Sequence, residues 1–299
     1  MKIDKASNRN IIKKIIIIGV GFITFFQNVV YGMDEVEFFQ KVKEKREFFK
    51  MCKVKYKREF IKWKNFEDYI RFKNEIEQKL WSLNKDKLFK WYLKNKIREY
   101  RDGDIQDITS YYEYEDKYPY INKMHTIIYL ESAKTKKNLK DACKGYEFLW
   151  EVNGKYREYC KKDGKSKLVK IDKADLKNLL NLGMGLGNFD FSLSPLERIK
   201  ERSNYEFKFE KDFIIKTNDG ELHFDYSKSL TAKKLISYSK ENGEIIEEGL
   251  YGAYEKVGNY YLPFFIINTT FSDKIESSVV LIEKYDRKSA KEKYFTIEE

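Results

Sequence analysis

Apolar side chains recur three or four residues apart through residues 34–101, which is the pattern of amphipathic helices. One such face contains Phe38, Val42, Phe49, Cys52, Tyr56, Phe60 and Trp63. Two further faces contain Tyr69, Phe72, Ile76, Leu80 and Leu83, and then Phe89, Leu93, Ile97 and Tyr100. Asn65 and Asn84 stand between these groups as breaks. The pattern therefore predicts two or three helices.

From residue 105 onward the pattern changes to the alternation of half-buried strands. Dipeptides that favour tight turns separate the strand-like runs: Asn153-Gly154, Asp219-Gly220, Asn242-Gly243 and Gly258-Asn259. Two short helices are predicted near residues 172–183 and 194–202, and a capping box opens the second. We therefore predict an α+β fold, in which N-terminal amphipathic helices precede a curled antiparallel β-sheet.

Residues 1–32 have the three parts of a secretory signal peptide. Basic residues precede an apolar run from Ile15 to Phe26, and Val30 and Gly32 fit cleavage before Met33. The alternative is an uncleaved membrane anchor, although the apolar run is short for a spanning helix. We expect an exported protein that works in the periplasm or cell envelope.

The positive charge is concentrated in one segment. The chain has a formal net charge of +11, and residues 41–64 contribute +8 of it, from eleven basic and three acidic residues. We expect a basic helix that docks onto an anionic membrane surface, and its candidate contacts are Lys50, Lys53, Lys55 and Lys57. A solvated helix face and an envelope protein's acidic patch are the alternatives. Nucleic acid is not expected, because lysine dominates over arginine and the compartment is extracytoplasmic.

Several stretches of the second half resemble the LolA-like family of periplasmic lipoprotein carriers, which includes the RseB-type stress sensors. The resemblance lies in the hairpin at 153–159, the strands around Asn242-Gly243, the hairpin at 254–264 and the tail at 284–297. It covers about residues 86–299 and implies a half-barrel, closed by helices, with an apolar concave face that binds acyl chains or apolar peptide segments. Residues 33–85 depart from the family as a basic helical extension.

Residue type and strand phase select the candidate ligand-binding residues Trp150, Phe224, Tyr251, Tyr254, Tyr260, Leu262 and Phe264. In this interpretation the half-barrel shelters an apolar or lipid group, such as the acyl chain of a lipoprotein. Two alternatives stay open. The chain's own helices cover the apolar face, or the chain is a structural or regulatory protein-interaction module of the envelope.

No catalytic, metal or cofactor site is expected. His125 and His223 are the only histidines, and neither lies beside a ligand set or a nucleophile motif. The glycine-rich stretch at 183–187 follows a predicted helix instead of a strand, so it does not fit a dinucleotide-binding loop. These patterns favour a binding protein over an enzyme.

The three cysteines suggest no disulfide framework. Cys143 and Cys160 flank the predicted hairpin at Asn153-Gly154, but the expected register places Cys160 opposite Glu147, four residues from Cys143. That offset is too long for a disulfide unless the chain bends before Tyr146.

Overall fold

The computed structural model describes residues 50–95, 99–103, 105–114, 121–130, 143–151, 154–162, 165–173, 205–209, 213–217, 220–225, 231–239, 241–288 and 292–296, with positions 40 and 44. The chain divides into two units, Met1–Lys41 and Val42–Glu299, and the second contains every element bounded below. The predicted signal peptide and the predicted helix at 194–202 lie outside the described residues. No helix within these ranges is long and apolar enough to cross a membrane.

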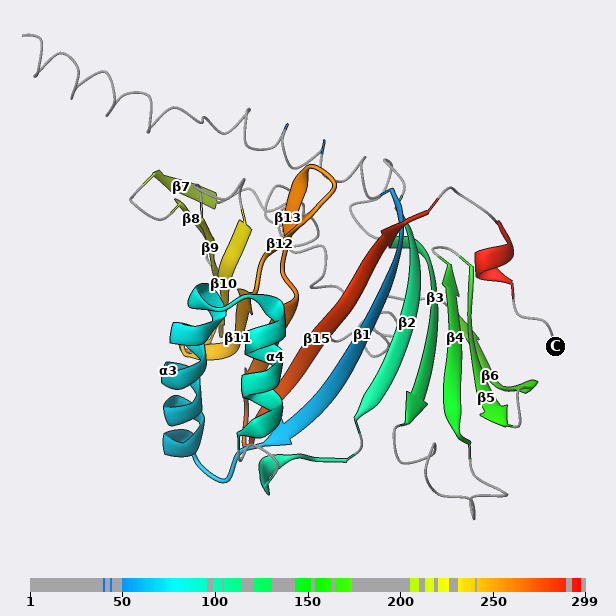
Figure 1. Cartoon of the computed structure of the whole chain (residues 1–299), viewed down its shortest axis with the longest axis horizontal. Coiled ribbons are helices and arrows are strands. Elements are labelled where there is room, and N and C mark those ends of the chain that lie inside the picture. The colour runs from blue at the N-terminus through cyan, green and yellow to red at the C-terminus, as the bar shows by residue number, and fades with distance from the viewer. Residues whose placement is uncertain are drawn as a thin grey trace, which may run out of the picture. The chain divides into compact units, whose positions relative to one another are not determined.

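Thirteen of the described strands form one antiparallel sheet, in the order β6-β5-β4-β3-β2-β1-β15-β14-β11-β10-β9-β8-β7 (Figure 1). One flank consists of β2 (Gln106–Tyr114), β3 (Ile121–Leu130), β4 (Gly145–Glu151), β5 (Lys155–Lys162) and β6 (Lys165–Lys173). The other consists of β7 (Tyr205–Phe209), β8 (Phe213–Thr217), β9 (Gly220–Asp225), β10 (Thr231–Tyr238), β11 (Ile245–Gly252) and β14 (Phe265–Phe271). A separate hairpin pairs β12 (Glu255–Val257) with β13 (Tyr260–Leu262).

Two long strands from opposite ends of the described chain join the flanks. Strand β1 (Met51–Lys62) pairs with β2 on one side and with β15 (Ile275–Arg287) on the other. The predicted antiparallel sheet is confirmed. Its centre differs from a simple meander, because the first described strand is inserted beside the last.

The prediction of a basic helix over residues 41–64 is wrong for residues 51–62, which form β1. Cys52, Tyr56 and Phe60 are four residues apart, and that spacing fits one face of a helix or of a strand. The burial of the residues from Cys52 to Tyr56 distinguishes a strand from a helix, because Cys52, Val54 and Tyr56 are buried while Lys55 is exposed. Alternation with a period of two is the strand pattern.

The next two predicted helices are confirmed as α3 (Phe66–Ser82) and α4 (Lys85–Lys94). The predicted breaks at Asn65 and Asn84 are their N-caps, and each amide oxygen accepts a hydrogen bond from the backbone N–H three residues later. The expected boundary between the basic extension, residues 33–85, and the half-barrel, residues 86–299, falls in the first turn of α4. Residues 51–85 are therefore part of the sheet unit and its helical cover, not a separate extension.

Helix α3 packs closely on β11 at Gly252. The backbone N–H of Ala253 donates to the Leu80 carbonyl at 2.9 Å, and a Cβ on Gly252 would lie only 2.6 Å from that same oxygen. The end of the helix can approach the strand this closely because Gly252 has no side chain.

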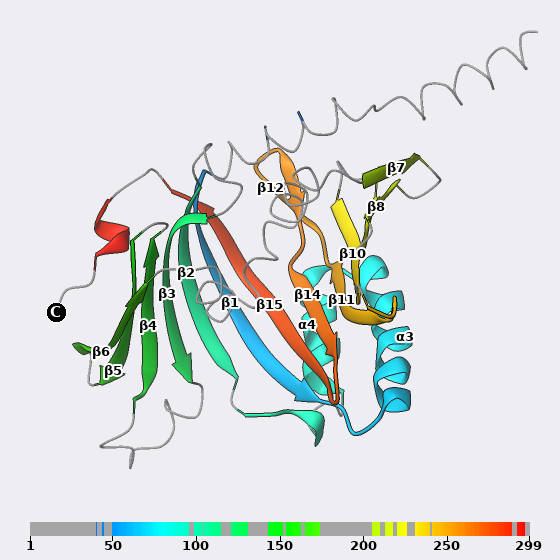
Figure 2. The same cartoon turned by 180° about the vertical axis from the view of Figure 1, so that it is seen from behind.

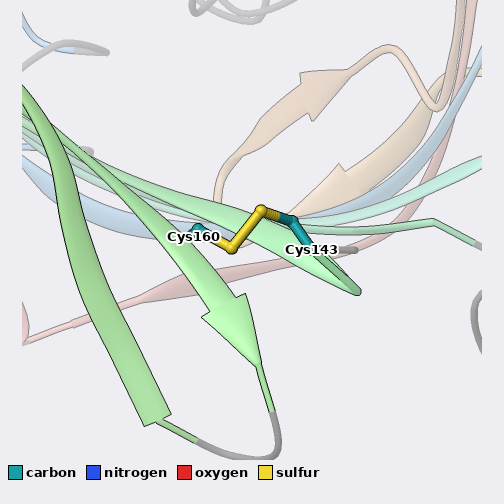
Figure 3. The surroundings of a disulfide bond; sticks show 2 residues. All are labelled: Cys143 and Cys160. Atoms are coloured by element: carbon teal, nitrogen blue, oxygen red, sulfur yellow. A yellow bond between two sulfur atoms is a disulfide. The ribbon is translucent and has the colours of Figure 1, made fainter. Parts of the chain in front are cut away.

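The expectation of no disulfide is wrong: Cys143 and Cys160 are bonded, with their Cα atoms 5.4 Å apart (Figure 3). The register differs by one residue from the expected one, so Cys160 faces Tyr146 instead of Glu147. The chain also stays close to β5 before β4 begins, because the Lys144 N–H donates to the Lys161 carbonyl. Both differences bring Cys143 within reach. The predicted helix at 172–183 is wrong at its start, since β6 extends to Lys173.

Candidate functional site

The two faces of the sheet differ in their cover. Helices α3 and α4 lie on one side, named here the helix face, where the Tyr69 hydroxyl donates to Glu248 of β11. The short helix η3 (Glu292–Phe295) lies on the same face, against His125 of β3. Figure 2 shows the sheet from its other side, named here the opposite face, with both α-helices behind it.

Large apolar side chains line the opposite face across β4, β3, β2, β1, β15 and β14. Strand alternation and the pairing registers place the following side chains there: Tyr56, Ile108, Tyr112, Ile128, Phe148, Trp150, Ile266, Val280 and Ile282. All of them are buried. The surface continues onto β5, where Tyr156 stacks on Phe148 with ring centroids 6.3 Å apart.

Arg58 of β1 places a positive charge on this otherwise apolar face. Its side chain is only 5% exposed. Nε and Nη2 both donate to the Gln106 side-chain oxygen, at 2.9 and 2.7 Å, and the guanidinium lies 4.9 Å from the centre of the Phe60 ring. Burial lowers the pKa of Arg58. The largest effects that raise this pKa are electrostatic interactions with Tyr56 and Tyr112.

Two further buried polar side chains lie on the same face of the sheet, on the strands beyond β1. Asn268 of β14 faces Ser278 of β15, and Ser278 faces Phe60 of β1. Asn268 is 5% exposed and Ser278 is 7% exposed. Within the described part of the chain, the Asn268 amide, the Ser278 hydroxyl and Arg58 Nη1 have no hydrogen-bond partner.

The helix face has its own buried polar cluster around Glu147 of β4. His125 Nε2 and Lys161 Nζ contact its carboxylate at 2.7 and 2.8 Å, and Ser166 donates to it. Burial alone would raise the pKa of Glu147, but the hydrogen bonds outweigh it and lower the pKa to about 2. The other ring nitrogen of His125 contacts the Tyr294 carbonyl at 2.6 Å.

This cluster does not have the geometry of a serine-hydrolase triad. In a serine triad the histidine lies between the serine and the carboxylate, so that it can take the serine proton. Here the Glu147 carboxylate lies between Ser166 and His125. Among the described residues there is also no cluster of three side chains able to hold a metal ion. The contacts of Glu147 instead connect β3, β4, β5 and β6.

No protein-family model and no curated protein matches the chain. Three solved structures are similar to it over most of its length. A LolA superfamily protein from Nitrosomonas europaea is 11% identical, with 89% of this chain and 98% of that chain covered and a TM-score of 0.45. An outer membrane lipoprotein-sorting protein domain from Vibrio parahaemolyticus is 8% identical, with 87% and 94% covered and a TM-score of 0.44.

The third, a DUF1329 family protein from Desulfovibrio piger, is 7% identical, with 87% and 95% covered and a TM-score of 0.45. The names of the first two agree with the LolA-like resemblance stated from the sequence.

The structure does not bring the seven predicted ligand-binding residues together. Trp150 and Tyr251 are buried on the opposite face, but five strands separate β4 from β11. Tyr260 and Leu262 belong to the separate β12–β13 hairpin. Tyr254 precedes that hairpin, Phe264 is buried against Tyr285 with ring centroids 5.1 Å apart, and the side chain of Phe224 lies outside the described residues.

The four predicted membrane-contacting lysines do not form a helical surface. Lys50 is exposed just before β1, and Lys53 lies over the Tyr111 ring at 5.3 Å. Lys55 and Lys57 lie on the helix face of β1 and form ion pairs with Glu283 at 2.9 Å and Asp107 at 2.7 Å. Two of the four lysines are thus neutralised within the sheet, and the four do not share one exposed helix face.

The placement of Arg58, Asn268 and Ser278 on one face was not predicted from the sequence. Arg58 was counted with the lysines around it, because a helical interpretation gave it no reason to differ from them. In a strand, side chains alternate between the two faces of the sheet. Arg58 is therefore on the same buried face as Val54 and Tyr56, whereas Lys55 and Lys57 are on the other face. Asn268 and Ser278 carried no signal that distinguished them from ordinary strand residues.

Proposed function

We propose that the protein is an exported cell-envelope binding protein that shelters an apolar or lipid group against the opposite face of its sheet. The observation that supports this most directly is the row of large apolar side chains that the pairing registers place between Trp150 on β4 and Ile266 on β14, on the face of the sheet opposite to α3 and α4 (Figure 2). An apolar surface of this kind is unfavourable in water and requires a cover. A lipid or the acyl chain of a lipoprotein would supply one.

The disulfide supports an extracytoplasmic location. Disulfides persist in oxidising compartments such as the periplasm and are rare in the cytosol. The Cys143–Cys160 bond therefore agrees with the predicted signal peptide at residues 1–32. The remaining cysteine, Cys52, is buried in β1 and is not part of a disulfide.

Native mass spectrometry of protein isolated from the cell envelope tests the proposal. The expected spectrum contains a fraction of the protein with a bound lipid mass, and delipidated protein should take up oleic acid in a titration. A lipid-free spectrum together with no uptake by the delipidated sample would contradict the proposed function.

The burial of the opposite face favours a second candidate function. Tyr56 and Tyr112 are each only 1% exposed. If the chain itself fills this side of the sheet, the protein is a structural or regulatory interaction module of the envelope, with no enzymatic role. A stoichiometric protein partner recovered from envelope extracts, with no lipid uptake by the delipidated protein, would select this candidate.

A further inference from the structure

Arg58 is the only buried basic residue of β1, and it has no carboxylate partner among the described residues. Lys55, Lys57 and Lys62 each form an ion pair, with Glu283, Asp107 and Asp102 respectively. These lysines are partly or largely exposed, whereas Arg58 is almost fully buried. Its only hydrogen-bond acceptor within the described residues is the neutral amide oxygen of Gln106. The one deeply buried cation of β1 thus lacks a carboxylate partner in the described part of the chain, whereas Lys53, which also has no ion pair there, is partly exposed and lies over the Tyr111 ring.

A buried guanidinium without an anion is costly. Transfer of an unpaired charge out of water costs several kcal/mol even after relaxation. A single amide oxygen and the Phe60 ring compensate only part of that cost, since each carries no net charge. An incoming anion would receive both the charge of Arg58 and the unused donor at Nη1.

Asn268 and Ser278 lie on the same face as Arg58, on the two strands beyond β1. In the register, Arg58 faces Val280, and Ser278 is two residues from Val280 on the same face of β15. Asn268 faces Ser278 from β14. Adjacent strands are ~4.8 Å apart, so the three Cα positions span ~10 Å across the sheet, but the Arg58 guanidinium is turned toward Gln106 of β2 and the Asn268 side-chain oxygen lies toward Gly249 of β11. The side-chain NH₂ of Asn268 and the hydroxyl of Ser278 are unused donors within the described part of the chain.

Between Arg58 and Trp150 the opposite face is apolar. The side chains along the way are Tyr56, Ile108, Ile128 and Phe148. From Arg58 on β1 to Trp150 on β4 the path crosses three strand spacings, ~14 Å, and shifts by six residues along the strands, ~20 Å. That span matches a long acyl chain. The one polar pair beside the path, Ser110 and Thr126, is already satisfied by its own 2.9 Å hydrogen bond.

We propose that Arg58 binds the anionic head group of a single-chain amphiphile whose acyl chain runs along the opposite face toward Trp150. This deepens the proposed function and rests on it. The head group is a carboxylate or a phosphate, because both present oxygen atoms that accept hydrogen bonds from a guanidinium. A neutral lipid would leave Arg58 unpaired.

Two ligands with the same chain and different head groups test this proposal. Delipidated full-length protein is titrated with oleic acid at a pH where it is ionised, and with oleyl alcohol. Hydrogen bonds to a charged group contribute ~1.5–3 kcal/mol, so the parent should bind oleate about tenfold to a hundredfold tighter than the alcohol. Oleoyl lysophosphatidic acid in a parallel titration distinguishes a phosphate from a carboxylate head group.

Matched variants assign the preference to Arg58. Arg58→Met should bind oleate and oleyl alcohol equally, and Arg58→Lys should keep part of the preference. Lys57→Met is the control, because Lys57 neighbours Arg58 but points to the helix face. This variant should prefer oleate over oleyl alcohol as strongly as the parent does.

The outcomes separate the two proposals. If the parent binds oleyl alcohol as tightly as oleate, or if Arg58→Met keeps the full preference, the head-group site is refuted while apolar binding stands. If the parent binds none of the three ligands, the proposed function itself is refuted.

Discussion

Removal of the Cys143–Cys160 disulfide should destabilise the sheet by a predictable amount. The two cysteines are 17 residues apart in sequence, and closing a loop of that length in the unfolded chain corresponds to ~3 kcal/mol. For a chain of this size that free energy lowers Tm by roughly 6–12 °C. The bond links the start of β4 to β5, whose outer neighbour β6 is the edge strand and is largely exposed. Amide exchange should therefore increase first in β5 and β6.

Thermal unfolding of the Cys143→Ser, Cys160→Ser double variant, with and without a reducing agent, is the assay. The parent should lose stability on reduction until it matches the double variant, which reduction should leave unchanged. Cys52→Ala is the control: Cys52 is buried and is not part of a disulfide, so its variant should keep the parent's full response to reduction. Three free thiols in the native protein isolated from the envelope, or a Tm that is insensitive to reduction, would refute the reasoning.

Four further predictions follow from individual contacts. The pKa of Glu147 is lowered from 4.5 to about 2, so the ionised carboxylate should contribute about 3 kcal/mol to the free energy of unfolding above pH 4.5. This contribution should be lost as the pH falls toward 2, and Glu147→Gln should flatten that part of the stability–pH curve. Glu248→Gln should cost about 2–3 kcal/mol in urea unfolding, because Lys73 and Lys234 lose their shared carboxylate; an unchanged midpoint would contradict this. Gly252→Ala should lower Tm and increase amide exchange in α3, and unchanged exchange there would show that the close contact is not required. Arg58→Met should leave Tm unchanged or raise it, whereas a fall of several degrees would indicate a structural role for the guanidinium.

The parts of the fold with a single periodic pattern were predicted correctly. Helices α3 and α4 have apolar residues at helical spacing and an asparagine N-cap at each start, so local sequence determined them. The prediction failed where the same apolar residues fit both the helical and the strand period. In β1, Cys52, Tyr56 and Phe60 fit a helix and a strand equally. Pairing with β2 and β15 then decided the structure, and that pairing is not visible in a local pattern.

The candidate site was predicted less well for the same reason. Trp150 was selected by strand phase and lies on the opposite face, but Leu262 belongs to the separate β12–β13 hairpin. The placement of Arg58, Asn268 and Ser278 on one face depends on the β1–β15–β14 register, which joins residues more than 200 positions apart. Composition and local periodicity carry no information on such a register.

Fluorescence quenching by a bromine-labelled fatty acid tests the central claim most directly, because each tryptophan reports on one side of the sheet. Trp150 lies on the opposite face, whereas Trp63 contacts Ser277 and Phe72 on the helix face, and Trp81 and Trp91 belong to α3 and α4. Stearic acid carrying two bromine atoms in mid-chain should quench the parent and the Trp81→Phe variant at the same ligand concentration. Trp150→Phe should lose that quenching while it still binds unlabelled stearic acid. Equal quenching of Trp150→Phe and the parent would place the acyl chain elsewhere and contradict the account.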